Sequence, residues 1–313
     1  MGAVSSSSIL GFFQPPPILA ISQQMPMKAE QGSNVLMSWS DIQHLPDDEL
    51  LELGRTSPAV PLMKPCDRTI HRVCMDTVTK GLVSTHEVAA LELVKSTTTI
   101  PVPAVRRFIF EPDSHGQHGQ LFMEFIPART LDQRWPHLSL WRKLIVVWTL
   151  RGYVRQLRKI PLPQTDQGPR PGPLGDKPSE CEGLLFGDYG GGPFNNYSEL
   201  TDWYAHKLAV AQKMNKAPNN ARPFDNTRPL VFTHLDLTPF NIILDDSNRL
   251  WIIDWGFSGI YPEWFEYACM MRNWQVLGGW YGKYICQFVA GRFERQYQFI
   301  LHIAWALARG MFM

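Results

Sequence analysis

The chain has few of the features that mark secreted proteins, proteins stabilised by a structural metal ion, or membrane-spanning proteins. Its 313 residues include only five cysteines, an odd number, at widely spaced positions: Cys66, Cys74, Cys181, Cys269 and Cys286. No C-x-x-C pair occurs, so neither a disulfide framework nor a structural zinc site is indicated. We therefore expect reduced thiols and a cytoplasmic protein.

Long apolar runs and blocks of one charge are also missing. No uncharged apolar stretch approaches the ~18–20 residues that span a bilayer, so we expect no stable membrane association. The formal net charge is +1, and basic residues form no block larger than pairs such as Arg106-Arg107. Proteins that bind nucleic acid usually concentrate Lys and Arg on one face. We therefore expect no nucleic-acid partner.

The N-terminal segment lacks the composition of a folded region. Residues 1–36 are rich in Ser, Pro and Gln, and Pro15-Pro16-Pro17 interrupts their apolar stretch, so we expect no signal peptide. We predict a disordered tail over 1–36, a small lobe over 37–125 and a larger lobe over 126–313. The chain is 44% hydrophobic and holds 11 Trp, which is ample material for two such lobes.

The two predicted lobes differ in their hydrophobic pattern. In the first, residues 72–79 predict two strands that fold at Met75-Asp76, with Lys80 directly after them, and residues 120–125 predict a further strand. A helix is expected from Ser84 to the Pro-containing segment 97–103. Residues after 126 are mainly helical in period, except 230–255, which predicts strand, loop and hairpin.

The candidate functional residues of the chain are concentrated in segment 230–255. Residues 234–241 (HLDLTPFN) have the form H-x-D-x-x-x-x-N. Two short apolar runs follow, separated by turn residues, and the second ends at Asp254-Trp255-Gly256. With a turn centred between Ser247 and Asn248, paired residues have numbers that sum to 495. This register places Asn241 directly across from Asp254, with their Cβ atoms about 4.5–5.5 Å apart.

These residue types suit phosphoryl transfer. An amide oxygen and a carboxylate held close together, Asn241 and Asp254, form a natural site for Mg²⁺, which often has few protein ligands and several phosphate oxygens. Asp236, at the mouth of the hairpin, is placed to accept the proton of a substrate hydroxyl. We expect His234 to orient the loop through hydrogen bonds and not to act as a base. Taken singly, each residue has a structural explanation as a turn residue.

Residues 231–267 resemble the catalytic core of the aminoglycoside phosphotransferase/choline-kinase-like family, in particular its fungal branch. The resemblance extends upstream through 192–194 (GPF), 122–127 (FMEFIP) and 99–103 (TIPVP). It implies an α+β, two-lobed protein-kinase-like fold, with a small β-rich N-terminal lobe and a larger, mainly helical C-terminal lobe. It also implies ATP or GTP as phosphoryl donor, Mg²⁺ as metal and a small-molecule acceptor.

Further site residues follow from the resemblance alone. Lys80 matches the lysine that ends the third strand and contacts the nucleotide phosphates, and Glu87 matches its helix partner. Backbone groups of Glu124 and Ile126 match those that meet the adenine edge. An alternative remains open for each of Lys80 and Glu87. Lys80 could be a solvated surface lysine, and Glu87 could form a capping box with Ser84 at the start of its own helix.

The sequence departs from protein kinases in two respects. No G-x-G-x-x-G precedes Lys80, so a Gly-rich phosphate loop is not indicated. Only a dozen residues lie between Asp254 and Tyr267, and no A-P-E-like activation segment is present. The favoured function is transfer of the γ-phosphoryl group to a hydroxyl or amine of a small molecule. A pseudokinase that acts as a binding or scaffold module is the alternative, and a protein kinase is a weaker one.

Aromatic residues are dense around this core. We expect those of residues 261–267 (YPEWFEY) to anchor the segment after Asp254 by packing. Four aromatic residues further on lie in helical sequence and are candidates to wall an acceptor pocket: Trp274, Trp280, Tyr281 and Tyr284.

Overall fold

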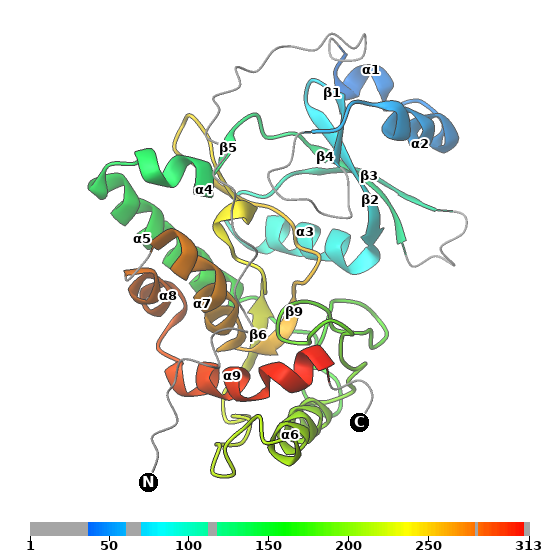
Figure 1. Ribbon diagram of the computed structural model, residues 1–313. Helices are drawn as coiled ribbons and strands as arrows, with labels where there is room; N and C mark the ends of the chain where they lie inside the picture. The colour runs from blue at the N-terminus through cyan, green and yellow to red at the C-terminus, as the bar shows by residue number, and fades with distance from the viewer. Residues whose placement is uncertain (1–36, 61–69, 112–117, 279–280, 310–313) are drawn as a thin grey trace. The chain divides into compact units, whose positions relative to one another are not determined.

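The computed structural model describes residues 37–60, 70–111, 118–278 and 281–309. Its N-terminal part is built on a four-stranded antiparallel sheet in the order β1-β2-β4-β3 (Figure 1). The elements of this part are α1 (Trp39–Ile42), α2 (Asp47–Thr56), β1 (Ile70–Cys74), β2 (Thr77–Ser84), α3 (Thr85–Thr97), β3 (Val105–Phe110) and β4 (His118–Glu124). The predicted strand pair and its turn at Met75-Asp76 are confirmed. The strand after that turn is longer than predicted, so Lys80 lies inside β2 and not after it.

The two faces of this sheet bury different sets of side chains. Successive residues of β4 point to opposite faces. Phe122 therefore joins a small cluster with Trp39 and Leu50 from the first two helices. Leu121 joins the main core with Leu91 of α3 on the other side. The sheet is thus held between the short N-terminal helices and α3. Just beyond α3, the N–H of Thr99 donates to the Gln156 side chain of α5 (2.8 Å).

The rest of the described chain is mainly helical. It contains β5 (Arg129–Thr130), α4 (Leu131–Arg134), the 3₁₀ turn η4 (Trp135–His137), α5 (Leu140–Leu157), α6 (Tyr197–Lys213), β6 (Leu230–Thr233), the 3₁₀ turn η5 (Pro239–Asn241), β7 (Ile242–Leu244), β8 (Leu250–Ile252), β9 (Gly259–Pro262), α7 (Phe265–Gly278), α8 (Gly282–Ala290) and α9 (Glu294–Arg309). The α+β, two-lobed arrangement predicted from the sequence is confirmed. The lobe boundaries themselves stay a prediction; the boundary expected after Phe125 falls one residue beyond the end of β4.

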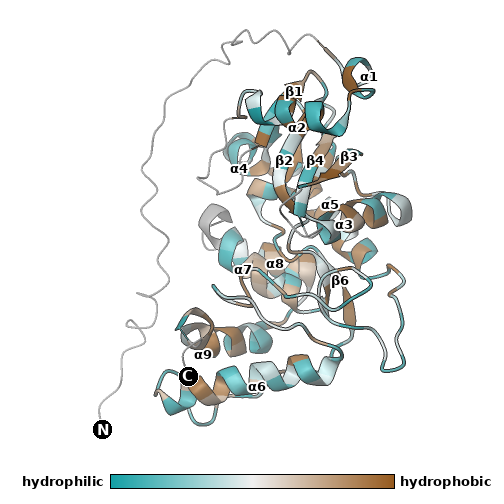
Figure 2. Ribbon diagram, turned by 90° about the vertical axis from the view of Figure 1, so that its right-hand side faces the viewer, coloured by the Kyte–Doolittle hydropathy of each residue, from teal (hydrophilic) through white to brown (hydrophobic). Residues whose placement is uncertain are grey.

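Local sequence explains where the long helices begin. The Ser139 side chain accepts from the N–H of Arg142 at the start of α5, and the Asn196 side chain accepts from the N–H of Glu199 at the start of α6. Along α5, Val146, Leu150 and Val154 recur at four-residue spacing and are buried. Figure 2 shows hydrophilic and hydrophobic residues alternating along α6 and α9, as expected of helices that bury one face.

Two small sheets in this lobe carry the candidate site. β6 pairs with β9, and β7 lies between β5 and β8. The loop that joins β6 to β7 holds the H-x-D-x-x-x-x-N motif, and β8 ends at Ile252, two residues before Asp254. In the described part of the chain, no helix is both long and apolar enough to cross a membrane.

Candidate active site

The motif segment folds into a compact loop closed by its own polar groups. The Asn241 side-chain amide donates to the Asp236 carboxylate (2.7 Å) and to the Asp236 backbone oxygen (3.0 Å). The N–H of Thr238 also donates to that backbone oxygen (2.7 Å). Asp236 and Asn241, five residues apart, are therefore held side by side, with Asp236 only partly buried at the loop surface.

His234 lies behind this loop and is fully buried. Its Nδ1 accepts from the N–H of Asp236 (3.2 Å), so its Nε2 carries the proton and donates to the Ile253 carbonyl (3.0 Å). The imidazole thus links the Asp236 loop to the end of β8. Burial lowers the pKa of His234 to about 4, against an opposing effect of the Asp254 carboxylate. These contacts agree with the predicted orienting role, which stays a prediction.

The neutral state of His234 predicts a pH dependence of stability. Between about pH 4 and 6.5 the imidazole of the unfolded chain binds a proton that the folded chain does not. The unfolded state then binds more protons, so the free energy of unfolding should fall as the pH drops from about 6.5 to about 4, in total by about 3 kcal/mol. Urea unfolding at a series of pH values measures this slope. The slope should flatten in His234→Gln.

A matched control for that series is His206→Gln, because His206 is exposed on α6. Its unfolding free energy should keep the pH slope of the unchanged chain. A slope that is equally steep in His234→Gln would show that other groups cause the acid sensitivity.

Glu266 is a site residue that the sequence did not reveal. This glutamate, in the first turn of α7, is 1% exposed, and its Oε2 accepts from the N–H of His234 (2.8 Å) and of Leu235 (3.4 Å). Leu235 has a φ of 65°, which is costly for a residue with a branched side chain. Burial raises the pKa of Glu266, and the N–H groups that it binds oppose this rise. Glu266 therefore holds the strained backbone directly before Asp236. No motif spacing links residue 266 to residue 234, so no pattern in the sequence pointed to it.

Lys80 joins the two lobes at the site. Its Nζ donates to Glu87 Oε1 (2.7 Å) and to Asp254 Oδ1 (2.6 Å). Lys80 is 5% exposed and Glu87 2%, whereas half of the Asp254 side chain is exposed. Burial alone would lower the pKa of Lys80, but the two carboxylates outweigh it and raise the pKa above its ordinary value. Lys80 is therefore a buried ion-pair residue, not a solvated lysine.

Glu87 has the contact that the resemblance implied. Ser84 is the N-cap of α3, yet its side chain makes no capping hydrogen bond to the described residues. The capping-box alternative for Ser84 and Glu87 is thus not the arrangement observed. The Glu87 carboxylate instead accepts from Lys80 across the gap between β2 and α3.

The predicted hairpin register is wrong by one residue. Paired residues have numbers that sum to 494, as in Ile242 with Ile252, and Asn241 therefore lies opposite Ile253 and not Asp254. The connection spans residues 245–249, an odd number, in which Asn248 has a φ of 61° and the Asp245 side chain accepts from the N–H of Arg249. A turn centred between two residues does not describe this loop.

Asp254 lies in the turn that follows the hairpin. Its φ is 62°, a left-handed conformation that Asp tolerates better than most residues. The chain turns out of the strand at this point, so the alternation of side chains in β8 no longer decides where Asp254 points. The contact with Lys80 shows where its carboxylate lies.

Glu124 and Ile126 lie at the connection between the lobes. The N–H of Glu124 donates to the Ala104 carbonyl (2.9 Å), and the Glu124 carboxylate accepts from the N–H of Ala104 (3.1 Å). The Ile126 carbonyl accepts from Ala128 (2.8 Å). The connector is thus well ordered by hydrogen bonds, and its predicted contact with adenine stays a prediction.

The aromatic segment after Asp254 is core, as expected from the sequence. Tyr261, Trp264, Phe265 and Tyr267 are fully buried. Of the candidates for an acceptor pocket, Trp274 is also fully buried and its Nε1 donates to the Leu237 carbonyl (2.9 Å). Tyr284 instead lies on the surface of α8. Trp280 lies outside the described residues.

The chain folds as an α+β, two-lobed protein, and its family match gives the class: a phosphotransferase. The family model of the phosphotransferase enzyme family (APH) matches residues 83–305, about seven tenths of the chain. The chain therefore belongs to the phosphotransferase enzyme family, as its resemblance suggested. No curated protein sequence matches it.

Solved structures with a similar course of the chain are aminoglycoside phosphotransferases. Spectinomycin phosphotransferase APH(9)-Ia, in complex with ADP and spectinomycin, is 13% identical with a TM-score of 0.48, over 83% of this chain and 84% of that one. APH(2″)-IIa in a streptomycin–ATP complex is 14% identical with a TM-score of 0.47, over 80% and 82%. APH(4)-Ia, as a thermostable mutant, is 13% identical with a TM-score of 0.47, over 82% and 89%. The family assignment rests on the family model, not on these likenesses.

Proposed function

We propose that this protein transfers the γ-phosphoryl group of ATP or GTP to a hydroxyl or amine of a small molecule. The observation that carries the proposal is the double contact of Lys80, which joins Glu87 of the small lobe to Asp254 of the large lobe. A buried lysine held between two carboxylates is an expensive arrangement for a purely structural purpose. In this proposal the Lys80 cation binds the nucleotide phosphates between the two lobes.

Each site residue predicted from the sequence has a role in this proposal. Asp236 accepts the proton of the attacking group, and its position is set by Asn241 and, through the backbone, by His234 and Glu266. Lys80 binds the nucleotide phosphates, with Glu87 as its partner. The backbone groups of Glu124 and Ile126 bind the base of the nucleotide. Phosphoryl transfer requires little more than such positioning and charge compensation.

Asn241 and Asp254 fit Mg²⁺ by the chemistry of their donor atoms. Both offer hard oxygen ligands, and about half of the Asp254 side chain is exposed to solvent. Among the described residues no cluster of three or more His, Cys, Asp or Glu is placed to hold a metal ion, so a bound ion would need phosphate oxygens as further ligands. When bound, Mg²⁺ would offset negative charge on the phosphates.

Transfer of labelled phosphate tests the proposal. The full chain is incubated with γ-labelled ATP or GTP and a cell extract, which is then separated into small-molecule and protein fractions. We expect the label in the small-molecule fraction, with labelling about 10²–10⁴-fold slower in the Asp236→Asn variant. Direct assays on a panel of small alcohols and amines then identify the acceptor.

Two results would contradict the proposal in different ways. Label chiefly in the protein fraction, dependent on Asp236, would indicate a protein kinase. Nucleotide binding by calorimetry without transfer to any fraction would indicate a pseudokinase that acts as a binding module.

A further inference from the structure

The outer face of α5 is apolar and open to solvent at its N-terminal half. Five residues at three- and four-residue spacing share this face, with exposures of 75% for Leu140, 71% for Trp141, 55% for Leu144, 48% for Ile145 and 68% for Trp148. Soluble proteins rarely expose so many large apolar side chains side by side, and patches of this kind mark interaction sites. We call these five residues the apolar stripe.

Positive charge surrounds the apolar stripe. Residues 140–160 contain six Lys or Arg and no Asp or Glu. Arg151, Arg155 and Lys159 continue the spacing of the stripe along the second half of α5 and just beyond it. Among the described residues, no carboxylate forms an ion pair with any of these three cations.

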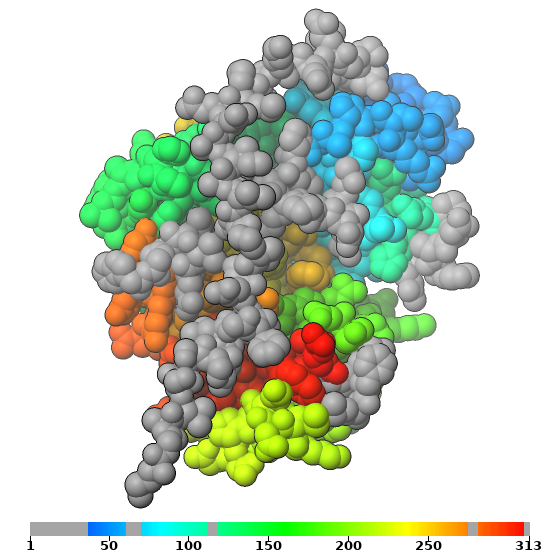
Figure 3. Space-filling model, viewed as in Figure 1, coloured from blue at the N-terminus to red at the C-terminus, as the bar shows by residue number. Residues whose placement is uncertain are grey.

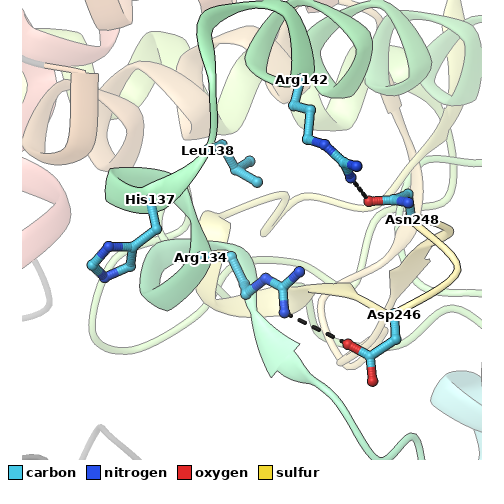
Figure 4. Close-up of a pocket in the computed structure, with 6 residues that line it drawn as sticks. All are labelled: Arg134, His137, Leu138, Arg142, Asp246 and Asn248. Carbon is cyan, nitrogen blue, oxygen red and sulfur yellow. Dashed lines mark hydrogen bonds and ion pairs between the residues drawn. The ribbon is translucent and has the colours of Figure 1, made fainter.

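The other end of the stripe is cationic as well. A cavity of about 340 Å³ lies at the start of α5, and its lining includes Arg134, His137 and Arg142 (Figure 4). Arg142 donates to the neutral Asn248, and Arg134 lies 3.7 Å from Asp246, whose side chain is 94% exposed. So exposed an ion pair is weak, and its carboxylate does not cancel the charge of this end.

α8 extends the apolar surface beside α5. Phe288 contacts Trp148 (5.6 Å between ring centroids), and Arg151 lies over the same ring at 4.5 Å. Tyr284, one turn before Phe288, is 60% exposed. Figure 1 shows α4, α5 and α8 together along one flank of the large lobe, and Figure 3 shows the green atoms of the α4–α5 region at the edge of the molecule.

We propose that this face binds reversibly to an anionic phospholipid membrane surface. Leu, Ile and Trp side chains enter the boundary between headgroups and acyl chains, where Trp is favoured. Arg151, Arg155 and Lys159, and the cations at the start of α5, meet the negative headgroups. The expectation of no stable membrane association rested on the lack of a spanning run, and peripheral binding needs none.

A second copy of the chain fits this face less well. In a two-fold pair with antiparallel α5 helices, the basic end of one helix would lie against the basic start of the other. In a pair with parallel helices, Arg155 would face Arg155. Both arrangements bring like charges together at the rim of the apolar contact, which costs free energy. An anionic membrane surface is broad enough to contact the cations at both ends of α5 and the apolar stripe between them.

Vesicle sedimentation with the full chain tests this inference. We expect binding to vesicles of phosphatidylcholine mixed with phosphatidylserine and not to phosphatidylcholine alone, with affinity that falls as salt rises. Leu144→Ser should lower the partition constant about tenfold, because an inserted apolar side chain is lost. The triple variant Arg151→Glu, Arg155→Glu, Lys159→Glu should lower it by a similar factor or more.

Leu301→Ser is the matched control, since Leu301 is also a partly exposed leucine on a helix, 39% exposed on α9. It should bind the mixed vesicles like the unchanged chain, and nucleotide binding should be unchanged in all these variants. Failure to bind the mixed vesicles, or equal binding to both kinds, would overturn the proposal. So would a concentration-dependent dimer in sedimentation velocity that Leu144→Ser abolishes, which would assign the face to a second copy.

Discussion

Replacement of Asp236 by Asn should lower the turnover of phosphoryl transfer by about 10²–10⁴-fold and leave nucleotide affinity within a few-fold. The shape of the side chain is kept, and its oxygen can still accept from Asn241, which holds the Asp236 carboxylate at 2.7 Å. What is lost is a group able to take a proton from the acceptor. Steady-state kinetics with the acceptor that the panel assay identifies, together with calorimetric nucleotide binding, separate the two quantities.

Asp202→Asn is a suitable control, because Asp202 is exposed on α6 and lies outside the proposed site. Its turnover should match that of the unchanged chain. Full turnover in Asp236→Asn would remove Asp236 from the mechanism.

Replacement of Lys80 by Met should impair both catalysis and folding. The Glu87 carboxylate, 2% exposed, would lose the cation that it contacts at 2.7 Å. Removal of one partner from a buried pair costs about 3–5 kcal/mol, and here the Glu87 contact carries the loss because Asp254 is half exposed and well solvated. Denaturant unfolding should show this drop, while the nucleotide KM rises and turnover falls.

A double variant separates the two effects. In Lys80→Met/Glu87→Leu no buried carboxylate is left without its cation, so much of the unfolding free energy should return while turnover stays low. Lys213→Met, at the exposed end of α6, should change neither quantity. Unchanged stability and kinetics in Lys80→Met would show that Lys80 is neither a required ion-pair residue nor a nucleotide ligand.

The pH response and the position of the Asp236 loop are linked through His234. Its proton on Nε2 is donated to Ile253, and its Nδ1 receives the N–H of Asp236. Protonation of Nδ1 would break the second bond and place a charge in a fully buried site. Acid conditions should therefore disturb the position of Asp236 as the protein loses stability, and both effects should weaken together in His234→Gln.

Several elements of the site follow directly from residue order. The H-x-D-x-x-x-x-N spacing brings Asp236 and Asn241 together, because a separation of five positions that ends in a 3₁₀ turn leaves the backbone little freedom. The apolar runs on either side of residues 245–249 are sufficient to predict the β7–β8 hairpin. Its register was predicted wrongly, since the turn conformation depends on the φ of Asn248 and on the Asp245 side chain, which hydrophobic alternation does not report.

Other contacts join residues that no local pattern connects. Lys80 and Asp254 are 174 positions apart, and their 2.6 Å contact exists because the small sheet and the large lobe meet at the site. Glu266 reaches the backbone of His234 and Leu235 from a helix that begins one residue earlier, at Phe265. Its role depends on burial and on two N–H groups aimed at it, which only the packed chain supplies.

The sequence by itself determined the motif residues and the pattern of strands and helices, because hydrophobic periodicity and short motifs act over a few residues. Its resemblance to a known family implied the class of the protein and the two-lobed fold. The tertiary structure decided which distant charges meet, how strongly burial alters the pKa of His234 and Lys80, and which apolar side chains stay exposed on α5. The reason is physical: desolvation and ion pairing depend on what surrounds a group in space. Leu144 and Leu150 lie on one helix, and only packing makes the first a surface residue and the second core.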